Sequence, residues 1–206
     1  SNANSSASLN EPRAKAIADF ERLGLPTKKD EDFKYTDVSK AFEPDFGINL
    51  KRLNIPADPE EVFQCDVPNL DTIQSFMVND AFYPYIKKES LLPEGVLFGS
   101  LKTLSEEHPE VVEKYYSKIA DTSKDAVCAL NTALAQDGIL FYVPKNVVID
   151  KPIQMINLLR ADVSLMANRR LLIILEANAE AKLLLCNHAM DSVAFLSTGV
   201  TEIFVG

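Results

Sequence analysis

The sequence contains one closely spaced pair of side chains that could bind a metal together, Cys186 and His188. In a strand, alternate residues point to the same face, so both side chains would lie on one side of a sheet. A thiolate with an imidazole suits iron or zinc. Two ligands make an incomplete site, however, and a free cysteine is usually a small buried hydrophobe. We therefore expect structural roles for both residues and assign no catalytic, cofactor-binding or metal-binding residue.

The rest of the sequence shows no common catalytic or ligand-binding motif. Its three cysteines, Cys65, Cys128 and Cys186, form no CxxC pair, so neither a zinc site nor a disulfide framework is indicated. Free cysteines favour a reducing compartment, and we predict a cytoplasmic protein. No phosphate loop, GxGxxG, HExxH or GxSxG is present. We predict a protein that is not an enzyme and binds no cofactor of its own.

The charge of the chain limits its possible partners. The formal net charge is −9 over 206 residues. This argues against non-specific nucleic-acid binding, which needs Lys and Arg to neutralise phosphates, and against an anionic membrane surface. Residues 1–125 hold 15 basic and 23 acidic residues, whereas residues 126–206 hold 6 and 7. This asymmetry predicts two structural regions.

The first region, residues 11–137, is predicted to be mostly helical, after a tag remnant and disordered tail at residues 1–10. Apolar spacing and turn residues predict helices at 11–23, 105–119 and 126–136, strand patterns at 72–82 and 97–101, and a loop at 49–68. The first helix is expected to end at Gly24. The last is expected to bury Val127, Leu130 and Leu134, and to end at Gly138.

The second region, residues 138–206, changes to strand patterns. Seven short strands are predicted at 139–143, 147–149, 153–159, 171–175, 181–186, 193–196 and 200–205. No helix lies between them, which excludes a doubly wound α/β fold and leaves a sandwich, a barrel or a solenoid. Strands that are apolar nearly throughout, and turns with few glycines, favour the solenoid. No six-residue repeat supports it.

The chain stops inside a predicted strand, after Val205 and Gly206. A solenoid needs a capping element at its last turn, and an uncapped apolar edge invites pairing with another chain. We therefore expect an N-terminal fragment of a longer protein, and we expect this fragment to self-associate through its open end.

Two stretches resemble the SufB/SufD family of iron–sulfur cluster assembly proteins. The first is LGLPT at 23–27 followed by DEDFKYTD at 30–37, and the second is ALNTALAQDGILFYVPKNVVIDKPI at 129–153. The segment FLSTGVTEIFVG at 195–206 continues the resemblance. The amino-acid sequence of the second stretch favours the SufD branch over SufB. Within it, Asn131, Asp137 and Lys145 are interpreted as cap and turn residues.

The resemblance implies a fold and a set of partners. It implies an N-terminal helical region and then the first turns of a right-handed parallel β-helix, so that the expected class is α+β or mainly β. It further implies a scaffold role in the SUF system, in a SufBCD complex with a SufB-like paralogue and a SufC-like ABC ATPase. The iron–sulfur cluster would belong to the full complex. The family's contact and cluster residues would lie beyond residue 206, so none is carried over.

Two other functions stay open at this point. A β-solenoid enzyme acting on carbohydrate or acyl groups would need clustered carboxylates, or hexapeptide repeats with a catalytic histidine. Neither pattern is visible in the sequence. The second open function is that of a protein-interaction scaffold with no role in metal chemistry.

Overall fold

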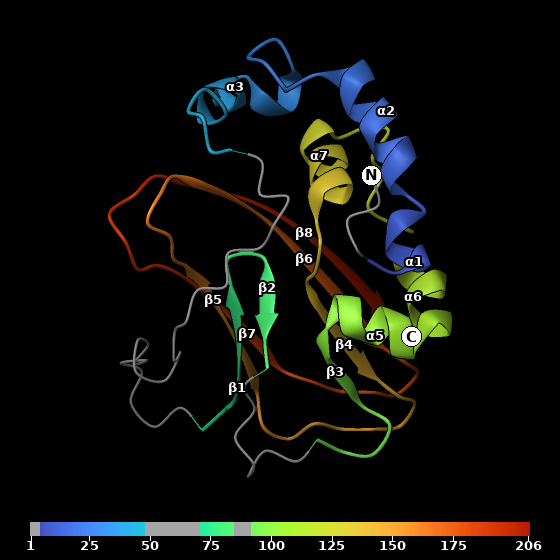
Figure 1. Cartoon of the computed structure of the whole chain (residues 1–206). Helices are drawn as coiled ribbons and strands as arrows, with labels where there is room; N and C mark the ends of the chain where they lie inside the picture. The colour runs from blue at the N-terminus through green and yellow to red at the C-terminus, as the bar shows by residue number, and fades with distance from the viewer. Residues whose placement is uncertain (1–4, 48–70, 85–91) are drawn as a thin grey trace.

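The computed structural model of the chain describes residues 5–47, 71–84 and 92–206 (Figure 1). Its helices are α1 (Ala7–Asn10), α2 (Arg13–Leu23), the 3-10 helix η1 (Glu31–Phe33), α3 (Val38–Ala41), α5 (Leu101–Glu107), α6 (Pro109–Tyr115) and α7 (Ala126–Leu134). Its strands are β1 (Ile73–Val78), β2 (Ala81–Tyr83), β3 (Leu97–Ser100), β4 (Ile139–Val143), β5 (Ile153–Leu159), β6 (Leu165–Leu175), β7 (Leu183–Ala189) and β8 (Phe195–Val205). The predicted loop at 49–68 and Cys65 lie outside the described residues.

The strands form two four-stranded sheets. The first sheet has the order β2-β1-β5-β7 and the second has the order β3-β4-β6-β8. In the first sheet β1, β5 and β7 run parallel, and β2 pairs antiparallel with β1. In the second sheet β4, β6 and β8 run parallel, and β3 pairs antiparallel with β4. Successive strands from β4 to β8 therefore alternate between the two sheets.

The predicted fold, a helical region followed by a right-handed parallel β-helix, is wrong. The described strands make two mixed sheets, in an α/β fold with few helices. Strands β1, β2 and β3 belong to the part of the chain expected to be mostly helical, yet they lie in the same sheets as the later strands. Their short patterns predicted strands but carried no information about these long-range partners. The domain boundaries at residues 10 and 137 stay a prediction.

The two sheets pack face to face around one apolar core. This core contains Ile73, Met77, Ile153 and Met155 from the first sheet and Ile139, Phe141, Val143, Leu171 and Ile173 from the second. Alternate residues of a strand point to opposite faces, so Leu140, Leu172 and Ile174 point away from this core. They form a second apolar cluster with Leu9, Leu101, Val112 and Tyr116. Helices thus cover the outer face of the second sheet (Figure 1).

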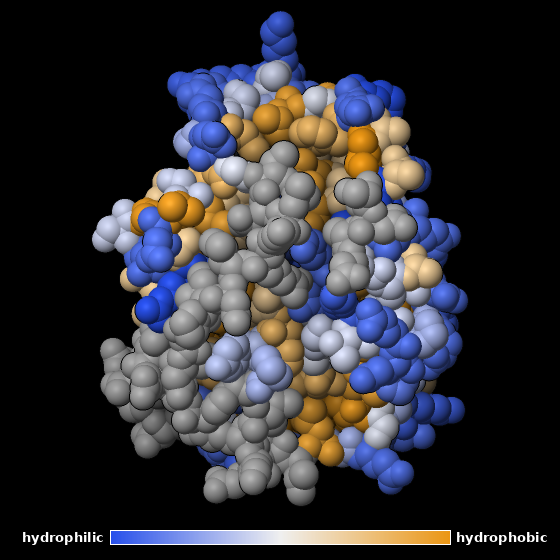
Figure 2. Space-filling model, viewed as in Figure 1, coloured by the Kyte–Doolittle hydropathy of each residue, from blue (hydrophilic) through white to orange (hydrophobic). Residues whose placement is uncertain are grey.

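The surface reflects this arrangement. Figure 2 shows mostly polar residues on the right-hand flank, where α5 and α6 lie, and apolar residues at the lower centre near β3. No helix within the described ranges has the length and apolar character needed to cross a membrane.

Several element boundaries differ from the sequence prediction. The predicted helix at 105–119 is two helices, α5 and α6, and the helix at 126–136 ends at Leu134. Gly138 does not end that helix. A side chain there would overlap the backbone carbonyl of Arg170, so Gly138 permits a close approach to β6. The predicted end of α2 at Gly24 is confirmed, with φ 65°.

The structure has five strands after Gly138, where seven short ones were predicted. β4 and β5 have the predicted bounds, whereas β6, β7 and β8 are longer than predicted. The prediction at 147–149 corresponds only to an isolated bridge between Val148 and Glu180. β6 and β8 each begin several residues earlier than the apolar patterns at 171–175 and 200–205. Polar residues such as Asn168 and Arg170 interrupt the apolar pattern of β6, although both are buried. Polar side chains that pair with these buried residues belong to the candidate site described below.

Candidate functional site

Two neighbouring arginines on β6 serve opposite faces of the second sheet. Arg169 lines a cavity of about 430 Å³ together with residues of both sheets. Arg170 lies beneath α7, and its side chain is 0% exposed. The opposite directions follow from the alternation of side chains along a strand.

Arg169 links the two sheets by hydrogen bonds. Its Nε donates to the carbonyl of Asn79 at 3.0 Å, and its Nη1 donates to Oδ1 of Asn187 at 2.9 Å. The same Asn187 oxygen accepts from Nδ2 of Asn157 at 3.1 Å. Nη2 of Arg169 is buried, and no described residue gives it a hydrogen-bond acceptor. Burial lowers the pKa of Arg169 to about 10, against the raising effect of the Asp80 charge.

Arg170 is compensated by a carboxylate. Its Nη2 donates to Oε2 of Glu202 at 2.6 Å, and the Glu202 side chain is 1% exposed. Its Nη1 donates to Thr132 Oγ1 at 3.0 Å, and its guanidinium carbon lies 4.7 Å from the ring centre of Tyr116. Within the part of the chain that the structure describes, Nε of Arg170 has no hydrogen-bond partner. The network therefore joins β6 and β8 to α6 and α7.

Glu202 also binds the loop that follows α6. Oε2 accepts the backbone N–H of Ser117 at 2.8 Å, and Oε1 accepts those of Ile119 at 3.0 Å and Ala120 at 3.1 Å. Burial by itself raises the pKa of Glu202, but the charge of Arg170 and these N–H groups outweigh burial and hold that pKa below its usual value. The carboxylate therefore stays ionised and fixes the loop to β8.

Asn131 and Asp137 are buried anchors within the stretch that resembles the family. Nδ2 of Asn131 donates to the carbonyl of Arg169 and to Oγ1 of Thr198, both at 3.0 Å, so the interpretation of Asn131 as a cap or turn residue is wrong. Oδ1 of Asp137 accepts from Ser100 Oγ at 2.8 Å and from the backbone N–H of Lys102 at 2.9 Å. Asp137 thus caps α5 from a distant part of the sequence.

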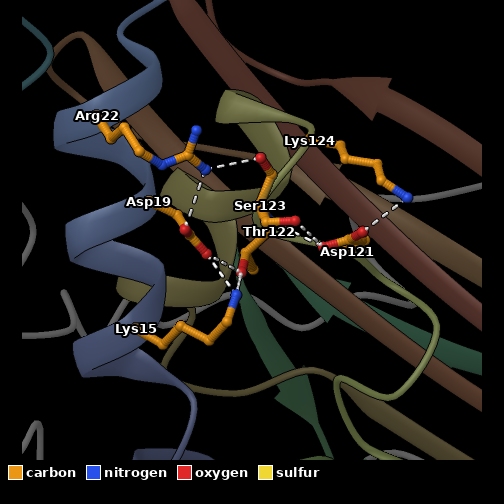
Figure 3. Close-up of polar contacts among 7 residues, drawn as sticks. All are labelled: Lys15, Asp19, Arg22, Asp121, Thr122, Ser123 and Lys124. Carbon is orange, nitrogen blue, oxygen red and sulfur yellow. Dashed lines mark hydrogen bonds and ion pairs between the residues drawn. The ribbon is translucent and has the colours of Figure 1, made fainter.

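A second polar cluster fixes α2 to the loop before α7 (Figure 3). Thr122 Oγ1 donates to Oδ2 of Asp19 at 2.6 Å, and the same oxygen accepts from Lys15 Nζ at 2.6 Å. Arg22 Nη2 donates to Oδ1 of Asp19 at 3.2 Å and to the carbonyl of Ser123 at 2.8 Å. The hydrogen bonds from Lys15 and Thr122, in that order, lower the pKa of Asp19 to about 2. The cluster is satisfied internally, so we interpret it as a structural anchor.

The structure places Cys186 and His188 on β7, on the face that points away from the central core. Cys186 is half-buried against the cluster of Phe76, Ile156 and Leu158, and its Sγ accepts from Gln154 Nε2 at 3.5 Å. His188 is exposed. Among the described residues, no group of three or more His, Cys, Asp or Glu side chains could hold a metal ion. The structural roles assigned to Cys186 and His188 stay a prediction.

The cavity beside Arg169 offers binding groups and no acid–base pair. Among the described residues, its lining contains Arg169, Arg170, amides and hydroxyls, with Ser197 and Thr201 contributing the hydroxyls, and includes no Asp, Glu, His, Lys or Cys. A guanidinium with such donors recognises a carboxylate or another oxyanion. The arrangement can bind and orient an anion, whereas proton transfer would need a titratable group from elsewhere.

Sequence reasoning missed Arg169, Arg170 and Glu202 as a site. A signal was present, because charged residues stand next to or inside apolar strand patterns at each position. Buried charges need a partner, so such residues indicate ion pairs or binding sites. The sequence could not show that Arg170 has an acidic partner 32 positions later.

Comparison with known proteins places this chain among iron–sulfur cluster assembly relatives. Residues 1–155 match the family model of the SufBD protein N-terminal region. A SufBD family protein of Synechocystis sp. is 25% identical over 181 residues, which are 87% of this chain and 38% of that protein. A SufBD family protein of Staphylococcus saprophyticus is 21% identical over 201 residues, which are 94% of this chain and 43% of that protein.

A shorter match is more similar. The iron–sulfur cluster assembly protein SufD of Bacillus subtilis is 37% identical over 67 residues, which are 32% of this chain and 15% of that protein. The chain spans less than half the length of all three relatives. The family model, in contrast, covers most of the chain. This chain therefore belongs to the SufBD family, of which it contains the N-terminal region.

Proposed function

We propose that this chain is part of a non-catalytic scaffold subunit of the SUF iron–sulfur cluster assembly system. The observation that carries the proposal is the family match over residues 1–155. The relatives that match most of the chain are named as iron–sulfur cluster assembly proteins. A cavity lined without acid–base groups and helices anchored by buried polar networks support a structural role.

Within the family, we propose the SufD branch. The B. subtilis relative, which is named SufD, is 37% identical over 67 residues, although a Synechocystis sp. relative that carries only the family name is 38% identical over 60 residues. The longer matches carry only the family name and do not favour either branch. SufD therefore stands as the finer part of this proposal.

The proposed partners are a SufB-like paralogue and a SufC-like ABC ATPase, acting together as a SufBCD complex in the cytoplasm. The iron–sulfur cluster is the product that this complex builds, and we propose that it is not held by the residues of this chain. The half-buried thiol of Cys186, packed against apolar neighbours, supports this assignment.

Co-purification tests the complex directly. The full-length gene product would be co-expressed with the SufB-like paralogue and the SufC-like ATPase of the same organism, and the ATPase would carry the affinity tag. We expect all three proteins to elute in fixed stoichiometry. The 206-residue chain serves as the control and should not elute with the ATPase, because the resemblance assigns ATPase docking to a C-terminal region. Expression of all three proteins without co-elution would contradict the proposal.

The alternative, a β-solenoid enzyme acting on carbohydrate or acyl groups, has lost its basis. It depended on a solenoid, and the described strands form two mixed sheets. Family membership also gives it no support.

We also propose that the 206-residue chain self-associates through β7 and β8, which are the outermost strands of their sheets. Leu185, Ile203 and Val205 on these strands are 54%, 53% and 75% exposed. Glu202, the one charged residue of β8, is buried, so neither edge carries an exposed charge that would block pairing. A mass of two chains in light scattering, reduced to one chain by Val205→Lys, is the expected result. A single-chain mass at high concentration would contradict it.

A further inference from the structure

We propose that residues 117–123, which we name the relay loop, couple the local stability of strand β8 to that of helix α2. In the described part of the chain β8 is the outermost strand of its sheet, whereas α2 packs against α7 (Figure 1). The relay loop follows α6 and contacts both elements. The inference rests on contacts within this chain and does not depend on a role in cluster assembly.

β8 holds the first half of the relay loop through Glu202. The carboxylate accepts the backbone N–H of Ser117 at 2.8 Å, and those of Ile119 and Ala120 at 3.0 and 3.1 Å. Ser117 has a φ of 57°, a left-handed conformation that is uncommon in residues other than glycine. Such a conformation persists only where its surroundings hold it, so the loop should relax when Glu202 releases it.

α2 holds the second half of the relay loop (Figure 3). Thr122, which is 5% exposed, donates its hydroxyl to Asp19 at 2.6 Å. Arg22 donates to the carbonyl of Ser123 at 2.8 Å. Asp19 and Arg22 both belong to the second half of α2. The relay loop therefore fixes that half of the helix.

The two anchors are close together, and the segment between them is braced. Only Asp121 separates Ala120 from Thr122. Its Oδ1 accepts the backbone N–H of Ser123 at 3.0 Å and the hydroxyl of Ser123 at 2.6 Å, which closes a turn. Each residue has only two soft backbone dihedrals. A shift at the β8 anchor therefore cannot be absorbed within the loop and reaches α2.

A second route from β8 to α2 ends at a different part of the helix. Thr198 on β8 accepts a hydrogen bond from Asn131 on α7 at 3.0 Å. Carbonyls at the end of α7 accept from Arg13 in the first turn of α2. The first turn of α2 therefore reports the route through α7, and the second half reports the relay loop.

The relay gives the open edge of β8 an effect on the helical layer. A strand that pairs with this edge would stabilise β8, and the relay loop would pass part of that stabilisation to α2. This consequence rests on the proposed self-association through β7 and β8. The relay itself does not, because its contacts lie within one chain.

Hydrogen exchange of the 206-residue chain tests the relay, at a dilution where light scattering gives the mass of one chain. The exchange rates of the second half of α2 are divided by those of β5. This strand is buried between β1 and β7, so its amides report global opening. The ratio thus separates local opening of α2 from a general loss of stability.

Glu202→Gln should raise this ratio on the order of fivefold. A carboxamide has one acceptor oxygen, which cannot serve Ser117 as well as Ile119 and Ala120. Thr201→Val is the matched control. Thr201 is the neighbouring residue on β8 and is exposed on the opposite face of the strand, so its substitution should leave the ratio unchanged.

Asp121→Ala tests the same connection at a position where folding is not at risk, because the Asp121 side chain is 45% exposed. The substitution opens the turn between the anchors and leaves Glu202 and Asp19 in place. We expect the ratio to rise by a similar factor. Glu202→Gln combined with Thr122→Val should exchange about as fast as the faster of the two single variants, because contacts in series transmit nothing once one of them is broken.

Three results would overturn the proposal. The first is an unchanged ratio in Glu202→Gln or in Asp121→Ala. The second is an equal rise in Thr201→Val, and the third is a double variant in which the two single effects multiply. Light scattering measures self-association separately, so the relay and the self-association can fail independently.

Discussion

Arg170 and Glu202 form a fully buried ion pair, and its effect on stability depends on the presence of both partners. Each side chain is at most 1% exposed, and Glu202 accepts three backbone N–H groups in addition to Arg170. Removing one member leaves an uncompensated charge in the interior, whereas replacing both with apolar residues of similar size is often tolerated. The pair therefore fixes the position of the loop after α6 more than it adds net stability.

Single substitutions at this pair should be strongly destabilising. We expect Arg170→Met to lower the free energy of unfolding by about 3–5 kcal/mol, because it leaves the Glu202 carboxylate buried without its cation. Urea denaturation measures this change. The double variant Arg170→Met with Glu202→Gln should recover a large part of the loss, because the amide is uncharged and its oxygen still accepts backbone N–H groups. Additive effects of the two substitutions would show that they do not act as a pair.

Acid should destabilise the protein through its depressed carboxylates. The pKa of Glu202 lies below its usual value, and that of Asp19 falls from 3.8 to about 2. A carboxylate whose pKa is lowered by folding stabilises the native state above its unfolded pKa, and this contribution is lost as pH falls through the folded pKa. The Asp19 contribution should therefore disappear between about pH 4 and pH 2.

Melting temperatures measured across this pH range check the expectation. Asp19→Asn should show a smaller decrease than the wild type, because the substituted amide does not titrate. An unchanged pH profile in Asp19→Asn would contradict the assigned pKa.

The pair Cys186 and His188 gives a test of the prediction that neither residue binds a metal. We expect the double substitution to alanine to leave iron binding by the 206-residue chain unchanged, since the thiol packs against apolar neighbours. Elemental analysis after incubation with ferrous iron under reducing, anaerobic conditions measures the bound iron. A stoichiometric iron signal that the substitution removes would refute the structural assignment.

At the scale of elements, α2 depends on polar contacts as well as on packing. Besides the Asp19 cluster, Arg13 donates to the carbonyls of Ala133 and Ala135 at the end of α7. The two helices are thus joined at both ends. Their positions relative to each other could not be predicted from sequence, because each contact links residues more than 100 positions apart.

Thr122→Val should loosen α2. It removes the buried hydroxyl that donates to Asp19, which costs about 1 kcal/mol and should speed hydrogen exchange of the α2 amides by several-fold. Lys124→Ala is the matched control in the same loop. Lys124 forms an exposed ion pair with Asp121, so its loss should leave exchange nearly unchanged. Equal protection of α2 in both variants would argue against this anchor.

The sequence predicted the elements better than their assembly. The helix that ends at Gly24, the strand and turn around Asn79 and the strand at 139–143 were all read from local patterns. The full lengths of β6 and β8 could not be predicted, because their buried polar residues interrupt the apolar pattern. The sheet to which each strand belongs could not be predicted either, since β1 and β3 pair with strands that lie far along the chain.

At the scale of the whole molecule, the proposed function rests on the family match, whereas the groups that could bind an anion were identified from the lining of the cavity. The family match confirms the SufB/SufD resemblance, whereas the β-helix expected from it is replaced by two mixed sheets. The cavity at Arg169 was not predicted, because it needs β5, β6, β7 and β8 to be placed together.

Reconstitution of cluster assembly tests whether this protein is a scaffold subunit. The complete complex would be assembled from the full-length gene product, its SufB-like paralogue and the SufC-like ATPase, and supplied with iron, a sulfur donor and a ferredoxin-type acceptor without its cluster. We predict that omitting this protein lowers the rate of cluster formation on the acceptor by about tenfold or more. An equal rate without it would contradict the claim.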